Sequence, residues 1–301
     1  MKHLIVISGP TAVGKTSVSV ALAKHYNCEI LSADSRQFFK ELNIGTAKPT
    51  YEEMDGVIHH FIGNRSISED YTAGKFEYDA LKVLDTIFKK HDVAILVGGS
   101  GLYIDALCNG LDDVPCDKKL RDELTTTFEK TGITFLQKEL QENDIDYFNV
   151  VDKNNPHRLI RGVEVFRLTG KPYSSFLQKK KLVRHFKCIN ITLEMERELL
   201  YKRINLRVDK MVNEGLETEV KSLILFKEKT ALKTVGYQEF FDYFDKKTTK
   251  DKAIALIKRN SRRYAKRQIS WFKRDKKAVW MNPNNFSHIL NHINSCLNSI
   301  N

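Results

Sequence analysis

Apolar residues fall into short runs and helical stripes that alternate along the first hundred residues of the chain. A β-rich run at 4–7 precedes a helical pattern over 17–25, and a second run at 29–33 is followed later by a helical stripe over 76–88. The run at 93–97 contains no polar residue, as is typical of a strand covered on both faces. This alternation predicts an α/β fold with a parallel sheet flanked by helices.

The pattern changes over residues 112–185. Here the chain is charged, its apolar residues recur at helical spacing, and no buried-strand run is found. We therefore predict an all-helical insertion that interrupts the α/β core. The expected division is 1–111 for the first part of the core, 112–185 for the insertion, and 186–301 for the completion of the core with basic C-terminal helices.

The chain is strongly basic, and its formal net charge of +11 favours a polyanionic partner. The cations gather on a predicted helix over 251–271, and more of them follow it directly. Clustering of this kind is what binding to a phosphate backbone requires, although a solvated basic face is the alternative. The candidates for nucleic-acid contact on this helix are Arg262, Arg263, Lys266 and Arg267.

Cysteine usage and hydropathy bear on the compartment. The five cysteines are scattered and include no C-x-x-C pair, which is typical of reduced thiols and not of a metal site or a disulfide framework. The apolar run at 4–7 is too short for a signal segment, and no stretch reaches the length of a membrane span. We expect a soluble, cytoplasmic monomer.

The most specific motif is GPTAVGKT at residues 9–16, which matches G-x-x-x-x-G-K-[ST] without a mismatch. It lies between a predicted strand and a predicted helix, as this motif requires. Its backbone N–H groups, the helix N-terminus and Lys15 would bind a di- or triphosphate, and the Thr16 hydroxyl could hold Mg²⁺. The residues expected at the phosphates are Gly9, Pro10, Thr11, Ala12, Val13, Gly14, Lys15 and Thr16.

Asp34 follows the second predicted strand. Ligands of open α/β sheets sit outside the carboxyl ends of the strands, so Asp34 should face the same crevice as Lys15. It could position Mg²⁺ or accept a proton, and its alternative is a helix N-cap. The strand at 93–97 ends in small residues and not in the Asp of many P-loop ATPases, which favours a transferase over motor-type ATP hydrolysis.

Arginines recur on the predicted helices. Arg158 and Arg161 lie three residues apart and share a helix side, and Arg203 and Arg207 are one turn apart on a later helix. For any single arginine, a charged solvated face is the alternative reading.

Taken together, these residues resemble the tRNA dimethylallyltransferase (tRNA isopentenyltransferase) family. The matching blocks, in the order of that family, are GPTAVGKT, DSRQ at 34–37, IGTAKP at 44–49, VGGSGLY at 97–103, HRLIR at 157–161, the Arg207 helix, TVGYQE at 234–239, and RRYAKRQISWFKR at 262–274. They cover nearly the whole chain. The resemblance implies transfer of a dimethylallyl group from dimethylallyl diphosphate to N6 of the adenosine 3′ to the anticodon, in tRNAs reading codons that begin with U.

The resemblance also implies roles for individual residues. Lys15, Arg207 and Mg²⁺ near Thr16 would stabilise the departing diphosphate, and Asp34 would take the proton of the attacking amine. The insertion would close over the anticodon stem-loop of the tRNA. The implied tRNA contacts are Asp34, Ser35, Arg36, Gln37, Ser100, Arg121, His157, Arg158, Leu159, Ile160 and Arg161. Ser100 stands where the family often has Thr. We expect a bacterial-type member, without the zinc-finger tail of eukaryotic members.

Three other functions remain open from the residues alone. A small-molecule or nucleotide kinase would also use a P-loop and an Asp, and ATP rather than a prenyl diphosphate should stabilise it. An adenylate prenyltransferase would act on free nucleotides and would leave the insertion and the basic helix unexplained. A non-catalytic RNA-binding module would not need Lys15, Thr16 and Asp34.

Overall fold

The structure is a computed structural model that describes residues 1–177 and 182–298. The chain divides into two compact units, one formed by Met1–Asn109 with Val183–Asn301 and the other by Gly110–Leu182. The second unit corresponds to the insertion expected at 112–185. Residues 178–181 of that expected insertion and residues 299–301 of the expected C-terminal part lie outside the described residues.

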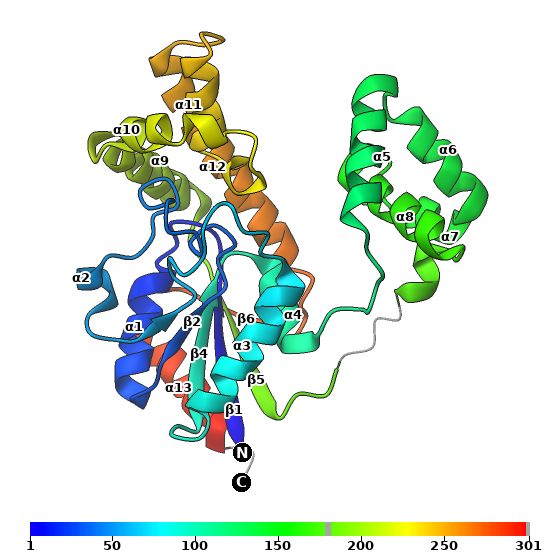
Figure 1. The fold of residues 1–301 in the computed structure, drawn as a ribbon. Helices are drawn as coiled ribbons and strands as arrows, with labels where there is room; N and C mark the ends of the chain where they lie inside the picture. The colour runs from blue at the N-terminus through cyan, green and yellow to red at the C-terminus, as the bar shows by residue number, and fades with distance from the viewer. Residues whose placement is uncertain (178–181, 299–301) are drawn as a thin grey trace. The chain divides into compact units, whose positions relative to one another are not determined.

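A parallel sheet forms the centre of the first unit, and its six strands within the described residues run in the order β3-β2-β4-β1-β5-β6 (Figure 1). The strands are β1 (Lys2–Ser8), β2 (Ile30–Ser32), β3 (His59–His60), β4 (Val93–Gly98), β5 (Phe186–Leu193) and β6 (Val279–Met281). In β1, Leu4 lies opposite Ala94 of β4 and Cys188 of β5. Because β1 pairs on both sides, the loop that follows it emerges at the middle of the sheet.

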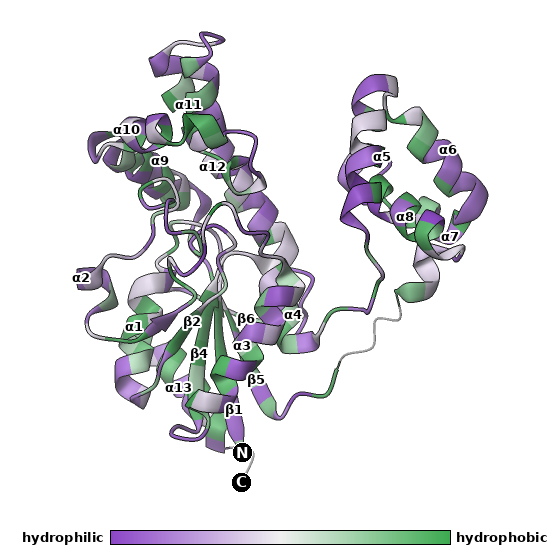
Figure 2. Ribbon diagram, in the orientation of Figure 1, coloured by the Kyte–Doolittle hydropathy of each residue, from purple (hydrophilic) through white to green (hydrophobic). Residues whose placement is uncertain are grey.

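Helices cover both faces of this sheet. Side chains alternate across a strand, so Ile5 and Ile7 of β1 face one core while Leu4 and Val6 face the other. The first core includes residues of α1 (Lys15–Tyr26) and α13 (Phe286–Asn298), and the second includes residues of α3 (Ala73–Ile87) and α4 (Gly101–Asn109). Figure 2 shows the strands as a largely hydrophobic centre between these helices. The predicted P-loop-like α/β class is confirmed.

A third core lies among the remaining helices of the first unit and includes Leu216, Tyr237 and Phe240. These helices are α9 (Arg197–Asn213), α10 (Leu216–Ser222), α11 (Tyr237–Phe244) and α12 (Lys250–Phe272), with 3₁₀ turns η2 (Ile224–Phe226) and η3 (Thr230–Leu232). The short helix α2 (Tyr51–Met54) contacts α1 and contributes no residue to this core. Helix α12 packs against α9, α11 and α4. It thereby joins this helical layer to the carboxyl end of β4.

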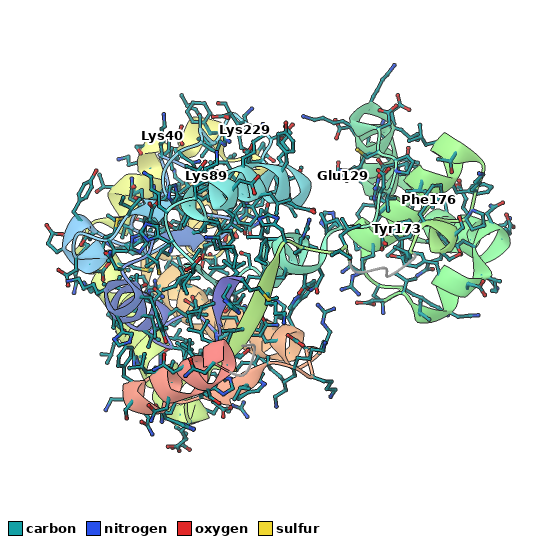
Figure 3. The ribbon with its side chains drawn as sticks, turned by 90° about the horizontal axis from the view of Figure 1, so that it is seen from below. Lys40, Lys89, Glu129, Tyr173, Phe176 and Lys229 are labelled. Carbon is teal, nitrogen blue, oxygen red and sulfur yellow. The ribbon has the colours of Figure 1, made fainter. Side chains whose placement is uncertain are left out.

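The second unit is entirely helical in its described part. Its elements are α5 (Lys118–Thr131), α6 (Thr134–Asn143), α7 (Ile145–Val150), α8 (Pro156–Thr169) and the 3₁₀ turn η1 (Tyr173–Phe176). Leu124, Leu136 and Leu159 belong to its apolar core. The ring of Tyr173, labelled in Figure 3, packs edge-on against Tyr147 with centroids 4.7 Å apart. The unit therefore has a hydrophobic core of its own.

Strands β3 and β6, of two and three residues, were not predicted from the sequence because each is too short to show an alternating pattern. Strand β2 also has three residues, but it lies within the longer run predicted at 29–33. His59 and His60 form β3, where the Nε2 atom of His60 lies 2.6 Å from a carboxylate oxygen of Glu29.

Within residues 1–177 and 182–298, no helix combines the length and the apolar character needed to cross a bilayer.

Candidate active site

The loop after β1 folds as an anion-binding turn. Gly9 and Gly14 have φ of 143° and 111°, which glycine adopts without strain. A Cβ on Gly9 would also lie 2.7 Å from the carbonyl oxygen of Leu193, so β5 leaves no room for a side chain there. Helix α1 begins directly afterwards at Lys15, with no side-chain cap and no acidic residue in its first turn. The first N–H groups of α1 are therefore left for an anion.

Lys15 folds back over this loop. Its Nζ atom donates to the carbonyl oxygens of Gly9 at 3.0 Å and Pro10 at 2.8 Å. Burial lowers the pKa of Lys15 to about 8, with the carboxylate of Asp34 opposing the shift and the guanidinium of Arg207 adding to it. A phosphate group at this position would restore the charged form, because it supplies the opposite charge that the loop carbonyls only partly replace.

Two arginines of α9 reach the same loop. Arg207 donates through Nη1 to the hydroxyl oxygen of Thr11 at 2.9 Å. The Nη2 atom of Arg203 lies 3.9 Å from where a Cβ of Gly14 would be. Burial lowers the pKa of Arg207, and Asp34 acts in the opposite direction. The loop is thus approached by three cationic side chains, which is the electrostatics expected of a diphosphate site.

Asp34 stands at the carboxyl end of β2. The Ala33 N–H donates to the Val97 carbonyl oxygen at 2.7 Å, which fixes the end of β2 against β4. The Oδ1 atom of Asp34 accepts the N–H of Arg36 at 3.0 Å, so the residue stabilises a turn. No helix begins directly after it, and the helix N-cap alternative is therefore wrong. Its charge nevertheless acts on both Lys15 and Arg207. One carboxylate and two cations therefore share the crevice.

Ser35, Arg36, Gln37 and Ser100 gather beside Asp34, and each is held by the protein itself. The hydroxyl of Ser100 accepts the Ser35 N–H at 2.9 Å. Gln37 donates through Nε2 to the carbonyl oxygens of Thr46 and Ala47, and Arg36 donates to that of Thr230 at 3.1 Å. Their contact with tRNA stays a prediction.

Helix α12 presents its basic residues unevenly. Arg263, Lys266 and Arg267 are exposed, whereas Arg262 is partly buried and donates to the Asn205 side-chain oxygen at 2.6 Å. The exposed side chains of Arg263, Lys266 and Arg267 are accessible to a phosphate backbone, although the guanidinium of Arg267 also lies over the ring of Tyr264, 5.7 Å from its centroid. Arg262 joins α12 to α9. All four remain predicted RNA contacts.

The predicted tRNA contacts of the second unit also differ in exposure: some are exposed, and others are buried or hydrogen-bonded within the protein. Arg121 makes two hydrogen bonds to Glu164, whose side chain is fully buried, and Arg161 makes a third at 3.0 Å. His157 and Arg158 are exposed at the start of α8. Leu159 and Ile160 are 0% and 3% exposed and pack in the core of the unit, so packing accounts for these two side chains.

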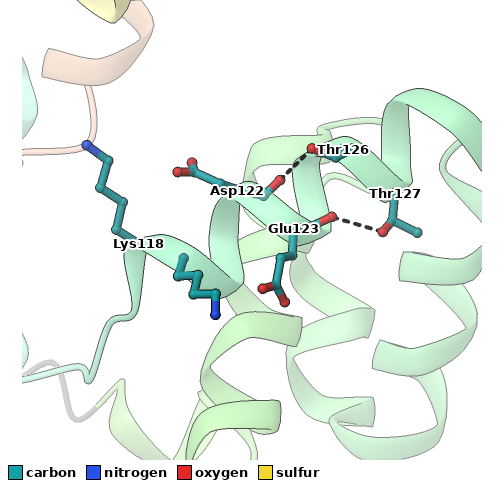
Figure 4. Close-up of a pocket in the computed structure, with 6 residues that line it drawn as sticks. Lys118, Asp122, Glu123, Thr126 and Thr127 are labelled. Carbon is teal, nitrogen blue, oxygen red and sulfur yellow. Dashed lines mark hydrogen bonds between the residues drawn. The ribbon is translucent and has the colours of Figure 1, made fainter.

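A surface depression on α5 is a weaker candidate for a site. It is lined by Lys118, Lys119, Asp122, Glu123, Thr126 and Thr127 (Figure 4). The hydroxyls of Thr126 and Thr127 donate to the carbonyl oxygens of Asp122 and Glu123 of the same helix. The hydroxyls of this depression are already hydrogen-bonded and its charged side chains are of both signs, so it offers no convergent polar groups. We therefore place the candidate site at residues 9–16, which we call the phosphate loop.

The residues at the phosphate loop fit Mg²⁺ better than a softer metal. Thr16 supplies a hydroxyl and Asp34 a carboxylate, and oxygen atoms of these kinds are the ligands that Mg²⁺ prefers. Among residues 1–177 and 182–298, no group of three or more His, Cys, Asp or Glu side chains could hold a metal ion.

Sequence patterns left several residues of this region without a role. Tyr264, Gln268 and Trp271 lie within the family-matching block at 262–274, where no individual role was assigned to them. In the structure, Gln268 contacts the phosphate loop and Trp271 donates to the carboxylate of Asp105. Burial, and then the charge of Asp34, raise the pKa of Tyr264 to about 12. A polar side chain on an otherwise buried stripe was the available signal for Gln268.

Comparisons with known proteins agree with the resemblance found in the sequence. A family model described as IPP transferase matches residues 37–275. The tRNA dimethylallyltransferase of Flavobacterium psychrophilum is 52% identical over 287 residues, covering 93% of this chain and 94% of that protein. The protein of the same name from Christiangramia forsetii is 50% identical and covers 99% of both chains, including the phosphate loop that precedes the family match.

Solved structures extend the comparison to the fold. The tRNA isopentenylpyrophosphate transferase of Bacillus halodurans superposes with a TM-score of 0.74 at 38% identity, over 99% of this chain and 98% of that one. A eukaryotic dimethylallyltransferase acting on tRNA gives a TM-score of 0.79 at 27% identity, over 95% of this chain and 75% of that one. With a family model matched over most of its length, and with relatives of this similarity, the chain belongs to the IPP transferase family.

Proposed function

We propose that this protein transfers a dimethylallyl group from dimethylallyl diphosphate to N6 of the adenosine 3′ to the anticodon, in tRNAs that read U-initial codons. The products are N6-(dimethylallyl)adenosine and diphosphate. The observation that carries the proposal is the placement of Lys15 and Arg207 at one phosphate-binding loop, with the carboxylate of Asp34 acting on both. The names of the relatives support the choice of substrates.

The cationic loop would act on the leaving group. An allylic C–O bond breaks readily when the departing diphosphate is stabilised. The N–H groups at the start of α1, Lys15 and Arg207 would donate hydrogen bonds to the diphosphate once it is bound. Losing one preorganised donor of this type commonly costs about a hundredfold in rate. Mg²⁺ held near Thr16 would add positive charge to the same phosphates.

Asp34 would act on the nucleophile. The lone pair of adenine N6 is delocalised into the ring, and the amine becomes acidic as it attacks the allylic carbon. A carboxylate within reach orients the amine and accepts its proton, so the charge of the base returns to neutral as the N–C bond forms. The base must leave its stack to enter the crevice, as for other enzymes that act on bases.

The partner would be the anticodon stem-loop of a tRNA. Arg263, Lys266 and Arg267 are exposed on α12, and His157 and Arg158 are exposed on α8. Cations of this kind bind the phosphate backbone without reading sequence, so selection of the adenosine would depend on the crevice around Asp34. We propose that the enzyme works as a cytoplasmic monomer.

Mass spectrometry of tRNA nucleosides tests the proposal. Unmodified tRNA is incubated with the protein, dimethylallyl diphosphate and Mg²⁺, and we expect the adenosine beside the anticodon to gain one dimethylallyl group. The matched reaction with ATP in place of the prenyl diphosphate serves as the control. Transfer of a phosphoryl group from ATP with no prenylated nucleoside would instead establish the kinase.

A further inference from the structure

One buried polar side chain of helix α12, Gln268, contacts the phosphate loop. Gln268 is 5% exposed, and its Oε1 atom accepts the backbone N–H of Thr11 at 2.8 Å. Its Nε2 atom donates to the carbonyl oxygen of Gly99 at 2.9 Å. A buried amide is costly unless its groups are hydrogen-bonded, and here both ends have a partner. One side chain thus joins the phosphate loop to the loop after β4.

The surroundings are built to admit this amide. A Cβ on Gly99 would lie 2.3 Å from the Nε2 atom of Gln268 and 3.7 Å from the Nζ atom of Lys15, so only glycine leaves space for the contact. Thr11 is held a second time, because Arg207 donates to its hydroxyl. Helices α12 and α9 therefore fix the backbone and the side chain of the same loop residue.

We propose that Gln268 is a positioning residue that holds the phosphate loop in its diphosphate-binding shape and ties that shape to the helix carrying Arg263, Lys266 and Arg267. This deepens the proposed function and rests on it. Gln268 touches neither substrate in this assignment. Its effect passes through the Thr11 backbone, because an anchored loop has less conformational freedom to lose when an anion binds.

The test measures binding of pyrophosphate with Mg²⁺ by calorimetry, which does not depend on turnover. Gln268→Met keeps the size of the side chain and removes both hydrogen bonds, and we expect roughly tenfold weaker binding. Asn260→Leu on the same helix is the matched control. It removes a hydrogen bond from a side-chain amide to the carboxylate of Glu239, away from the phosphate loop. The control should bind pyrophosphate like the wild type.

A second variant separates positioning from misfolding. Gln268→Glu keeps an oxygen that can accept the Thr11 N–H, so hydrogen exchange at Thr11 should stay slow in this variant and become fast in Gln268→Met. In turnover assays, Gln268→Met should raise KM for dimethylallyl diphosphate and leave KM for tRNA unchanged.

Two results would overturn the assignment. One is wild-type pyrophosphate affinity in Gln268→Met, and the other is equal protection of Thr11 in both Gln268 variants. A wild-type protein that binds pyrophosphate but prenylates no tRNA would defeat the proposed function instead, and the binding data for Gln268 would still decide the present inference.

Discussion

The hydroxyl of Tyr237 donates to Oε1 of Glu219 at 2.6 Å, beneath the loop at 44–49. The same carboxylate accepts the backbone N–H groups of Asn43, Ile44 and Gly45. Burial, and then this carboxylate, raise the pKa of Tyr237. A Cβ on Gly45 would lie 2.5 Å from the Tyr237 ring, so the loop rests directly on it. Since Gln37 donates to carbonyl oxygens of that loop, the pair also supports one predicted RNA contact.

Removing either partner should cost stability, and by different amounts. Tyr237→Phe removes one hydrogen bond to a charged group and should lower the free energy of unfolding by about 1–2 kcal/mol. Glu219→Ala leaves three N–H groups and a hydroxyl without their acceptor and should lower it by about 3 kcal/mol or more. Urea unfolding measures both. Glu217→Ala on the same helix, which removes only a surface ion pair with Lys250, is the control and should change stability by less than about 1 kcal/mol. Equal losses for Glu219→Ala and Tyr237→Phe would contradict this account.

Replacing Asp34 should separate chemistry from RNA binding. We expect Asp34→Asn to lose at least about a hundredfold in turnover, because the amide cannot take the proton of the adenine amine. The amide oxygen can still accept the Arg36 N–H, so the turn and the tRNA affinity should be nearly unchanged. Asp34→Ala removes the turn contact as well and shows what the turn contributes. Single-turnover rates and filter binding are the measurements, and wild-type turnover in Asp34→Asn would remove the general base.

The exposed cations of α12 should set the salt dependence of tRNA binding. Each phosphate contact that is lost lowers the slope of log K against log[salt] by about 0.7–0.9. We expect Arg263→Gln with Arg267→Gln to lower the slope by about 1.5 if both contact phosphates. Lys89→Gln, an exposed cation at the end of α3, is the control. An unchanged slope in the double variant would move the RNA footprint elsewhere.

Glu164 should make the second unit sensitive to acid. Burial raises the pKa of this carboxyl, but hydrogen bonds from Arg121, the Asp117 N–H and Arg161 outweigh it and hold the pKa below its ordinary value of 4.5. The native state therefore favours the ionised form, and the stabilisation present above pH 4.5 is lost as the pH falls through the lowered pKa.

The matched variant for this prediction is Glu164→Gln. It should destabilise the protein by about 1–3 kcal/mol at pH 7, toward the lower end because Arg121 is partly in water. Its urea midpoint, followed by circular dichroism, should approach that of the wild type as the pH falls below 4.5 and through the lowered pKa. A constant difference between the two proteins across this range would show that the charge of Glu164 contributes nothing.

Binding of a diphosphate should recharge Lys15. Because the pKa of Lys15 in the free protein is about 8, the amine is largely neutral at pH 9 and largely charged at pH 6.5. An anion raises this pKa, so pyrophosphate should bind with proton uptake at pH 9 and with little uptake from this group at pH 6.5. Calorimetry in buffers of different ionisation enthalpy measures the protons.

Lys15→Arg supplies the comparison for that titration, because arginine stays charged at both pH values. Pyrophosphate itself exchanges protons to the same extent with the wild type and with Lys15→Arg. The difference in proton uptake between the two proteins therefore reports the titration of Lys15. We expect the variant to lack the extra uptake at pH 9. Identical uptake in the two proteins would place the titrating group elsewhere.

The local order of residues was enough to determine the framework of this protein. The uninterrupted run at 93–97 and the motif at 9–16 are contiguous signals, and they became β4 and the loop between β1 and α1. The helical insertion was also visible, because its apolar residues repeat at helical spacing. The family followed from the order of the motifs and is confirmed by the comparisons.

The partners of individual polar side chains became known only from the folded chain. The resemblance implied that Arg121 and Arg161 contact tRNA, and only the fold revealed that both donate hydrogen bonds to the buried carboxylate of Glu164. Gln268 meets Thr11 across 257 residues of sequence, a distance at which no periodic pattern carries information. The physical reason is that hydrophobic spacing reports the face a residue occupies, whereas the partner of a buried polar group depends on which distant backbone the fold brings against it.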